Sequence, residues 1–233
     1  MSGIYGAAGL TDMAACLAVL EKKNHMYGTV GSDRYEGAGF AMGCCMEQAG
    51  CAVLQAGDAR GVIDALLYNR EELLPLAGVD AQANDAEILF RLILQKGPDV
   101  LKQVNGDFAG AIYFENTSRW LLFRDHLGVR PLYTYQKEHA FAFSTDLRGL
   151  LALPGADLMP DERQMYLRIM GGDMSSAEAT DFACCRMLKA GHYTWLTADG
   201  ARQENTYYVP GKKKKRLIRR KQCEEKLYAL VED

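Results

Sequence analysis

Apolar residues recur at helical spacing in two long segments of the chain. In residues 12–23 they return every three or four positions, and Thr11 is the expected N-cap. In residues 84–87 (NDAE), an Asn acceptor followed three positions later by Glu has the pattern of a capping box that opens a second helix. Gly97 and Pro98 should end that helix, and Pro98 suits the first turn of a further short one. Shorter helices are expected at 70–76 and 146–153.

Short apolar runs separated by polar turns predict strands in the rest of the chain. These runs lie at 2–8, 40–46, 51–55, 62–67, 108–114, 120–123, 132–135, 140–144, 192–196 and 203–209. Asp199-Gly200 is a typical hairpin turn between the last two runs. Residues 28–39 are rich in glycine and polar side chains and are expected to form turns. Strand pairs with helices grouped between them favour a layered α+β architecture.

Composition argues against several classes of function. The chain has 233 residues, 48% of them hydrophobic, which is enough to bury the core of one ordinary domain. A net charge of −3 gives no global field that would attract nucleic acid. No secretion signal is visible, and no apolar run approaches the roughly 20 residues needed to cross a bilayer. We therefore expect a cytoplasmic protein that binds neither nucleic acid nor membrane.

The cysteines also favour a cytoplasmic protein. The seven cysteines are an odd number without a secretion signal, which predicts reduced thiols. The adjacent pairs at 44–45 and 184–185 lack the C-x2-C spacing of a zinc site, so no metal is expected.

A basic run at 211–221 (GKKKKRLIRRK) follows the last predicted strand. It indicates a domain boundary, with one domain at 1–210 and a linker plus the start of a further domain at 211–233. Residues 212–221 could instead bind nucleic acid or an anionic membrane, and this alternative stays open. The run has no interleaved aromatic residues, which favours the linker.

Several longer motifs resemble one known family. Residues 105–108 (NGDF), 124–133 (RDHLGVRPLY) and 141–147 (FAFSTDL), with a Gly-His pair at 191–192, resemble the N-terminal, glutamine-hydrolysing domain of asparagine synthetases. The resemblance to these class II (type 2) glutamine amidotransferase domains covers nearly the whole chain. It implies an N-terminal-nucleophile (Ntn) hydrolase fold, a four-layer αββα sandwich. None of these motifs is catalytic in the family.

The chemistry that the resemblance implies is hydrolysis of the glutamine side-chain amide. In the family the initiator Met is removed, and the exposed Cys attacks the amide while its own α-amino group serves as general base. An Asn side chain and a Gly backbone N–H hold the oxyanion, and losing one such donor typically costs about 10²–10³ in rate. An Arg and an Asp bind the carboxylate and amine of the substrate.

At the nucleophile and oxyanion positions this sequence departs from the family. Ser2 replaces the Cys, and serine is a weaker nucleophile than a thiolate. Asp64 and Ala65 stand at the Asn and Gly of the oxyanion site, and a carboxylate there has the wrong charge. An alternative register places residues 56–58 (AGD) at this position, and it loses the Asn as well.

The substrate-binding positions are also altered. Residues 43–46 (GCCM) stand where the family has Gly-His-x-Arg, so the carboxylate-binding Arg is missing. Asp85 matches the amine-binding acid of the family. An Asp in the first turn of a helix is also favoured by the helix dipole alone, and this structural interpretation is the stronger one.

These losses favour a degenerate, non-catalytic domain that supports an asparagine-synthetase-like, ATP-using partner domain or subunit. Degenerate domains of this kind also occur in β-lactam synthetases and lasso-peptide cyclases. The alternative is an active amidohydrolase that uses Ser2 as both nucleophile and amine base, with glutamine or another amide as substrate. A homodimer is left open.

No cofactor is expected in this chain, since ATP and Mg would bind only to the partner domain. The Ser-Gly-Gly-x-Asp-Ser loop of an ATP site is absent, and residues 171–173 (GGD) are interpreted as an ordinary loop. The histidines receive no catalytic role.

Overall fold

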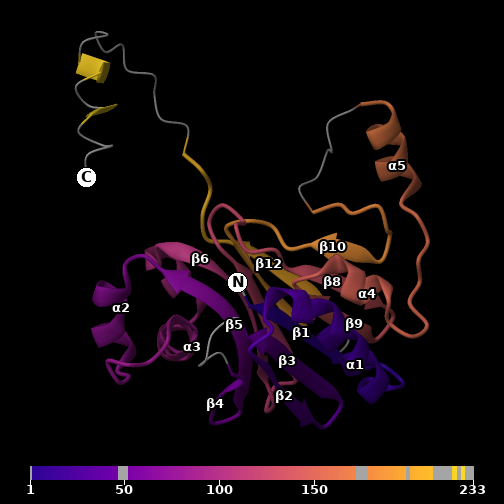
Figure 1. Cartoon of the computed structure of the whole chain (residues 1–233), viewed down its shortest axis with the longest axis horizontal. Coiled ribbons are helices and arrows are strands. Elements are labelled where there is room, and N and C mark those ends of the chain that lie inside the picture. Colours follow the sequence, from indigo (N-terminus) through magenta and orange to yellow (C-terminus); the bar gives the residue numbers. More distant parts are fainter. Residues whose placement is uncertain are drawn as a thin grey trace.

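The computed structural model describes residues 2–46, 52–171, 178–197, 200–211, 222–224 and 227–228. Two six-stranded antiparallel sheets lie face to face, and helices cover their outer faces (Figure 1). This arrangement confirms the expected αββα sandwich.

In both sheets the spatial order of the strands differs from their order along the chain. From one edge to the other, the first sheet contains β10 (Cys185–Met187), β8 (Tyr133–Lys137), β9 (Ala140–Ser144), β1 (Gly3–Ala8), β3 (Phe40–Met46) and β2 (Gly31–Gly37). The second contains β12 (Arg202–Thr206), β11 (His192–Thr197), β7 (Arg119–Arg124), β6 (Gly106–Phe114), β5 (Ala59–Leu67) and β4 (Leu54–Ala56). The helices are α1 (Met13–Asn24), α2 (Arg70–Ala77), α3 (Asp85–Lys96), α4 (Leu147–Leu151) and α5 (Glu162–Ile169), with 3₁₀-helices η1 (His25–Tyr27) and η2 (Pro98–Gln103).

The layer between the sheets is apolar because alternate residues of the central strands point into it. Ile4, Met42 and Phe143 of the first sheet and Trp120 and Leu122 of the second are all buried in this cluster. The strands that carry these residues are thereby held in a defined register, which also sets the position of Ser2 just before β1.

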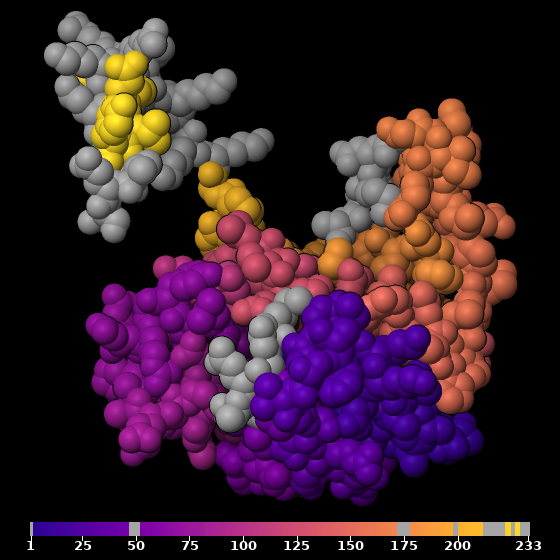
Figure 2. Space-filling model, viewed as in Figure 1, coloured from indigo at the N-terminus to yellow at the C-terminus, as the bar shows by residue number. Residues whose placement is uncertain are grey.

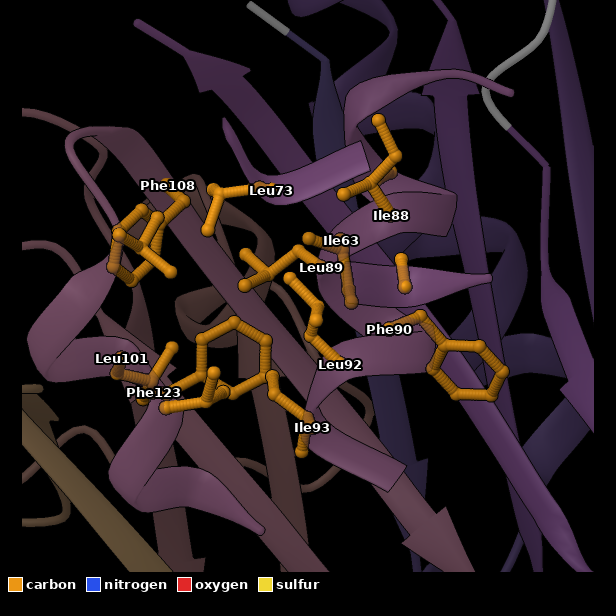
Figure 3. Packing of buried hydrophobic residues seen from close by; sticks show 14 of the residues in the cluster. Ile63, Leu73, Ile88, Leu89, Phe90, Leu92, Ile93, Leu101, Phe108 and Phe123 are labelled. Carbon is orange, nitrogen blue, oxygen red and sulfur yellow. The ribbon is translucent and has the colours of Figure 1, made fainter. Parts of the chain in front are cut away.

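The outer faces are covered by amphipathic helices. On the second sheet, Leu89 and Leu92 of α3 lie against Phe108 and Phe123 (Figure 3). On the first sheet, Leu17 and Leu20 of α1 belong to the buried cluster that covers β1 and β3. Burying such side chains contributes roughly 1.5–3 kcal/mol each.

Most predicted elements are confirmed, and a few need correction. Helix α1 is capped by Asp12 rather than Thr11, because the Asp12 side chain accepts the Ala15 N–H. The expected strand at 51–55 is observed further along the chain, as β4 at 54–56. The hairpin between β11 and β12 forms as expected, with Gly200 at a positive φ of 85°, while Asp199 lies outside the described residues.

Residues 28–39 do not consist of turns alone, because β2 occupies Gly31–Gly37 and pairs with β3 along its length. Its sequence, GSDRYEG, is polar since no residue of this edge strand is fully buried. Strand β10 and helix α5 were not predicted. Helix α5 projects from the body of the sandwich (Figure 2), and several of its apolar side chains, including Tyr166 and Ile169, are exposed.

Some predictions fall on residues that the structure does not describe. Met1, the basic run at 212–221 and residues 172–173 of the Gly-Gly-Asp segment all lie outside the described residues. Among the helices that are described, none combines the length and apolar character required to span a bilayer.

Candidate active site

Ser2 and Asp64 come together, although Ser2 precedes a strand of the first sheet and Asp64 lies on a strand of the second. The backbone N–H of Ser2 donates to Oδ1 of Asp64 on β5 at 3.0 Å, and both residues are buried. Ser2 is followed by Gly3, where a Cβ would lie 2.7 Å from the backbone oxygen of Asn24, so only glycine fits there. The structure thus places the candidate nucleophile Ser2 beside the buried carboxylate of Asp64.

Arg130 completes this cluster from a third segment of the chain. Its guanidinium Nη1 lies 3.3 Å from Oδ2 of Asp64, and the side chains are only 14% and 9% exposed. The two oxygens of Asp64 are therefore engaged by different partners. No role was predicted for Arg130 from the sequence. Two sequence features could have indicated it: the arginine in the 124–133 motif and the unexpected acid at residue 64.

The 124–133 motif forms the loop that presents Arg130. The carboxylate of Asp125 accepts the backbone N–H groups of Leu127, Val129 and Arg130 at 2.9–3.0 Å. The guanidinium of Arg124 donates to the backbone carbonyls of Gly128, Arg130 and Leu188. Such charge-assisted bonds to the backbone determine the path of the loop.

Burial dominates the electrostatics of Asp64. It raises the pKa of the carboxyl above its ordinary range, because a charged group loses hydration in the interior. Arg130 and the Ser2 N–H oppose this rise, since both stabilise the carboxylate. Asp107, a neighbouring acid on β6, raises the pKa further.

Ala65 lies on the other face of β5. Its side chain packs against the cluster beneath α3, whereas Val62, an odd number of positions away, is buried between the sheets. The Ala65 methyl group therefore lies in the core beneath α3 and not beside Ser2. The alternative residues 56–58 lie at the β4–β5 turn, where Gly57 has a φ of 56°.

Residues 43–46 place no guanidinium at the site. They belong to β3, and Cys44 and Cys45 are buried on opposite faces of the sheet, between the sheets and under α1 respectively. Register pairs Cys45 with Gly3 and Cys44 with Ile4, so the segment does run alongside the start of β1.

Both carboxylate oxygens of Asp85 are occupied. Oδ2 accepts the backbone N–H of Leu67 at 2.8 Å, and Oδ1 pairs with Nη1 of Arg70 at 2.6 Å. Asp85 is the first residue of α3, whose cap Asn84 accepts the Glu87 N–H, as the capping box predicts. The geometry gives Asp85 a structural role at the junction of β5, α2 and α3.

A cavity of about 370 Å³ opens near the cluster of Ser2, Asp64 and Arg130. Tyr68 and Asp107 line it, and the Tyr68 hydroxyl donates to Oδ2 of Asp107 at 2.6 Å. Neither Ser2 nor Asp64 is among its lining residues. Within the described ranges, no group of three or more His, Cys, Asp or Glu residues is arranged to hold a metal ion.

Two of the histidines, His126 and His192, have structural surroundings. The ring of His126 makes edge contacts with Phe108, Tyr207 and Tyr208, and burial lowers its pKa. His192 bonds the Ala190 carbonyl and the Thr206 hydroxyl.

Comparison with known proteins identifies the family of this chain. Residues 58–208 match the family model described as a glutamine amidotransferase domain. The chain is 35% identical over 93 residues to asparagine synthetase B [glutamine-hydrolyzing] of Escherichia coli (strain K12), covering 38% of this chain and 17% of the relative. It is 34% identical over 100 residues to carboxyethyl-arginine beta-lactam-synthase of Streptomyces clavuligerus, covering 42% of this chain and 19% of that protein. The match thus spans about a fifth of the length of these curated relatives.

A solved structure agrees with the fold. Glutamine phosphoribosylpyrophosphate amidotransferase from B. subtilis, complexed with ADP and GMP, superposes with a TM-score of 0.60 at 15% identity, covering 88% of this chain and 49% of the other. At 15% identity this likeness shows the sandwich fold alone.

Proposed function

Because the chain belongs to the glutamine amidotransferase domain family, we propose that it is a degenerate type 2 domain, a non-catalytic scaffold for an asparagine-synthetase-like, ATP-dependent amide-forming domain. The partner would lie in the same polypeptide or in a separate subunit, and it would be the part that binds ATP and Mg²⁺. We place the boundary of the scaffold at residue 210. The observation that carries the proposal is the carboxylate of Asp64 beside the Ser2 nitrogen.

The charge of Asp64 opposes the reaction that the family catalyses. Attack on an amide carbonyl develops negative charge on its oxygen, and family members stabilise that charge with hydrogen-bond donors. Asp64 offers acceptor oxygens at the position of the Asn donor. An oxyanion formed next to Ser2 would be repelled where it needs a donor.

Asp64 also weakens the base that the mechanism requires. In a chain whose Met1 has been removed, the α-amine of Ser2 would lie at hydrogen-bond distance from this carboxylate. An anion at that distance favours the ammonium form and raises the amine pKa above its ordinary range of about 7.7–8.0. An ammonium has no lone pair. A smaller fraction of the protein molecules would therefore have a neutral amine that could accept the Ser2 hydroxyl proton at neutral pH.

The substrate-binding groups support the same proposal. The 43–46 segment supplies buried cysteines in place of a bidentate guanidinium. Asp85 is already bonded to Arg70 and to the Leu67 N–H, so binding a substrate amine would mean giving up those contacts.

The relatives support the nature of the partner. One is named as a glutamine-hydrolysing asparagine synthetase and another as a beta-lactam synthase. In both, the matched region is less than a fifth of the protein. Both names describe enzymes that form an amide bond. We therefore propose an amide-forming partner for this chain.

A second candidate is an N-terminal-serine amidohydrolase acting on glutamine or another amide. It is favoured by the placement of Ser2 just before β1, where the Thr145 hydroxyl accepts the Ile4 N–H at 3.0 Å and holds the strand end in place. This geometry would suit a nucleophile if Asp64 were neutral.

The test combines the intact mass of the purified protein with an assay for glutamate release from glutamine. The proposal predicts no release above a buffer blank, with Met1 present or removed. Release that is lost in Ser2→Ala, in a protein lacking Met1, would establish the second candidate instead. Circular dichroism of both proteins verifies that the comparison is between folded chains.

A further inference from the structure

A second and larger cavity lies at the open edge of the sandwich. Its volume is about 640 Å³, within the range of roughly 300–1,000 Å³ found for small-molecule sites. Strands β8 and β10 of the first sheet and β12 of the second contribute most of its wall. The lining residues are Thr134, Gln136, Ala183, Cys184, Arg186, Gly200, Arg202 and Glu204. None of them belongs to the cluster around Ser2 and Asp64, so a role for this cavity is independent of the proposed function.

Strand register shows how the first sheet faces this cavity. Thr134 lies opposite Phe143 and Gln136 lies opposite Phe141, and both phenylalanines are buried between the sheets. Directly opposite residues of an antiparallel pair share a face, so Thr134 and Gln136 point into the same layer. Arg186 lies opposite Thr134 and therefore points into it as well.

The second sheet presents charged groups from the other side. Arg202 lies opposite Leu196, which is buried between the sheets, so Arg202 points toward the first sheet. Glu204, two positions along β12, shares that face. At this edge the apolar layer is thus replaced by polar and charged side chains from both sheets.

The charges in the cavity are unbalanced toward positive. Glu204 is the one acid in the described wall, and it pairs with both Arg202 at 3.4 Å and Lys189 at 3.1 Å. Arg186 has no ion-pair partner within the described part of the chain. Burial lowers the pKa of Arg202, and the nearby charge of Arg186 lowers it further, although Glu204 opposes both.

We propose that this cavity binds a small organic anion, whose phosphate or carboxylate group lies between the guanidinium groups of Arg186 and Arg202. Guanidinium groups present paired N–H donors that match the oxygens of either anion, and two of them facing one layer favour an anion over a neutral ligand. The Gln136 amide donates to the Gly200 carbonyl at 2.9 Å, which leaves its own oxygen as an acceptor for a donor on the same ligand. The volume exceeds that of a bare phosphate and leaves room for an attached organic group.

The test is isothermal titration calorimetry of the full chain at low ionic strength, with inorganic phosphate and citrate as separate probes. We expect saturable binding of at least one probe. Arg186→Gln and Arg202→Gln should each weaken it about tenfold or more, because each removes a charge-assisted pair. Binding of phosphate alone identifies a phosphate-bearing ligand, and binding of citrate alone a carboxylate; binding of both supports an anion site that accepts either group.

Arg34→Gln is the matched control. Arg34 is an exposed arginine on β2 that pairs with Glu36 and does not line the cavity, so its loss should change affinity by less than about twofold. Arg202→Lys retains the charge and should retain part of the affinity, and thermal melts verify the folding of each variant. The proposal is overturned if neither probe binds, or if all three glutamine variants weaken binding equally, since that would indicate a general charge effect.

Discussion

The guanidinium of Arg130 lies 3.3 Å from the carboxylate of Asp64, and on the other side of that carboxylate lies the backbone nitrogen of Ser2. A buried acid with a single arginine partner normally reflects a balance between lost hydration and ion pairing. In the function proposed above, this acid also stands where the family places its oxyanion donor. On that proposal the same residue affects stability and limits chemistry, and both effects can be measured.

Replacing Asp64 by Asn should restore a donor to the site. We expect the double variant Ser2→Cys, Asp64→Asn to release glutamate at a rate at least about tenfold above the buffer blank, since one oxyanion donor is worth about 10²–10³ in rate. The assay should use high glutamine concentrations, because residues 43–46 supply no guanidinium to bind the glutamine carboxylate. Ser2→Cys, Asp64→Leu removes the charge without adding a donor. Equal activity of the two double variants would contradict the assigned role of Asp64.

The pH dependence of stability should also change in Asp64→Asn. The pKa of Asp64 is raised in the folded state, so between about pH 3.9 and that raised value the folded protein holds more protons than the unfolded chain. The free energy of unfolding then falls as pH rises through this window. The advantage of Asn over Asp should accordingly be smallest below about pH 3.9 and grow with rising pH.

Urea unfolding at a series of pH values measures this difference. Arg130 and Asp107 are the charged side chains that most affect Asp64, and both remain in the variant. A difference that stays constant from about pH 3 to 7 would show that the Asp64 pKa is not raised.

Removing Arg130 should destabilise the protein more than removing an exposed arginine. Arg130→Gln leaves the Asp64 carboxylate buried without its charged partner, which typically costs ~3–5 kcal/mol. The double variant Asp64→Asn, Arg130→Gln should recover most of this loss. Arg34→Gln, at a side chain that is 55% exposed, should stay within about 0.5 kcal/mol of wild type. Additive single and double effects in urea unfolding would exclude coupling between the two residues.

Asp85 should behave as a structural residue. Asp85→Ala removes the acceptor for the Leu67 N–H and the partner of Arg70, and it also removes a negative charge from the first turn of α3. We expect a loss of about 1–3 kcal/mol in unfolding free energy. Asp99→Ala removes a 68% exposed acid paired with Lys102 and should cost less than about 1 kcal/mol. A stability unchanged by Asp85→Ala, with altered glutamine binding, would assign it to substrate instead.

Local sequence determined the elements whose bonds connect near neighbours in the chain. The cap of α3 needs only Asn84 and the Glu87 N–H, and the 124–133 loop is built largely by Asp125 bonding the N–H groups of the next few residues. Such patterns are readable because donor and acceptor lie a few residues apart. The family resemblance of that loop, together with the apolar periodicity of α3, was sufficient to predict the sandwich.

Only the tertiary structure decided which residues meet. Strand β2 is polar and becomes a strand through pairing with β3, so its own composition carried no strand signal. Arg130 reaches Asp64, and Arg186 and Arg202 share one cavity, because strands from two sheets are held in register by an apolar layer. The sequence alone determined that an acid stands at residue 64 and which local elements form. The residues that surround Asp64 were decided by long-range packing. No local pattern encodes this packing, because the contacting residues are far apart in the chain and are brought together only by the fold.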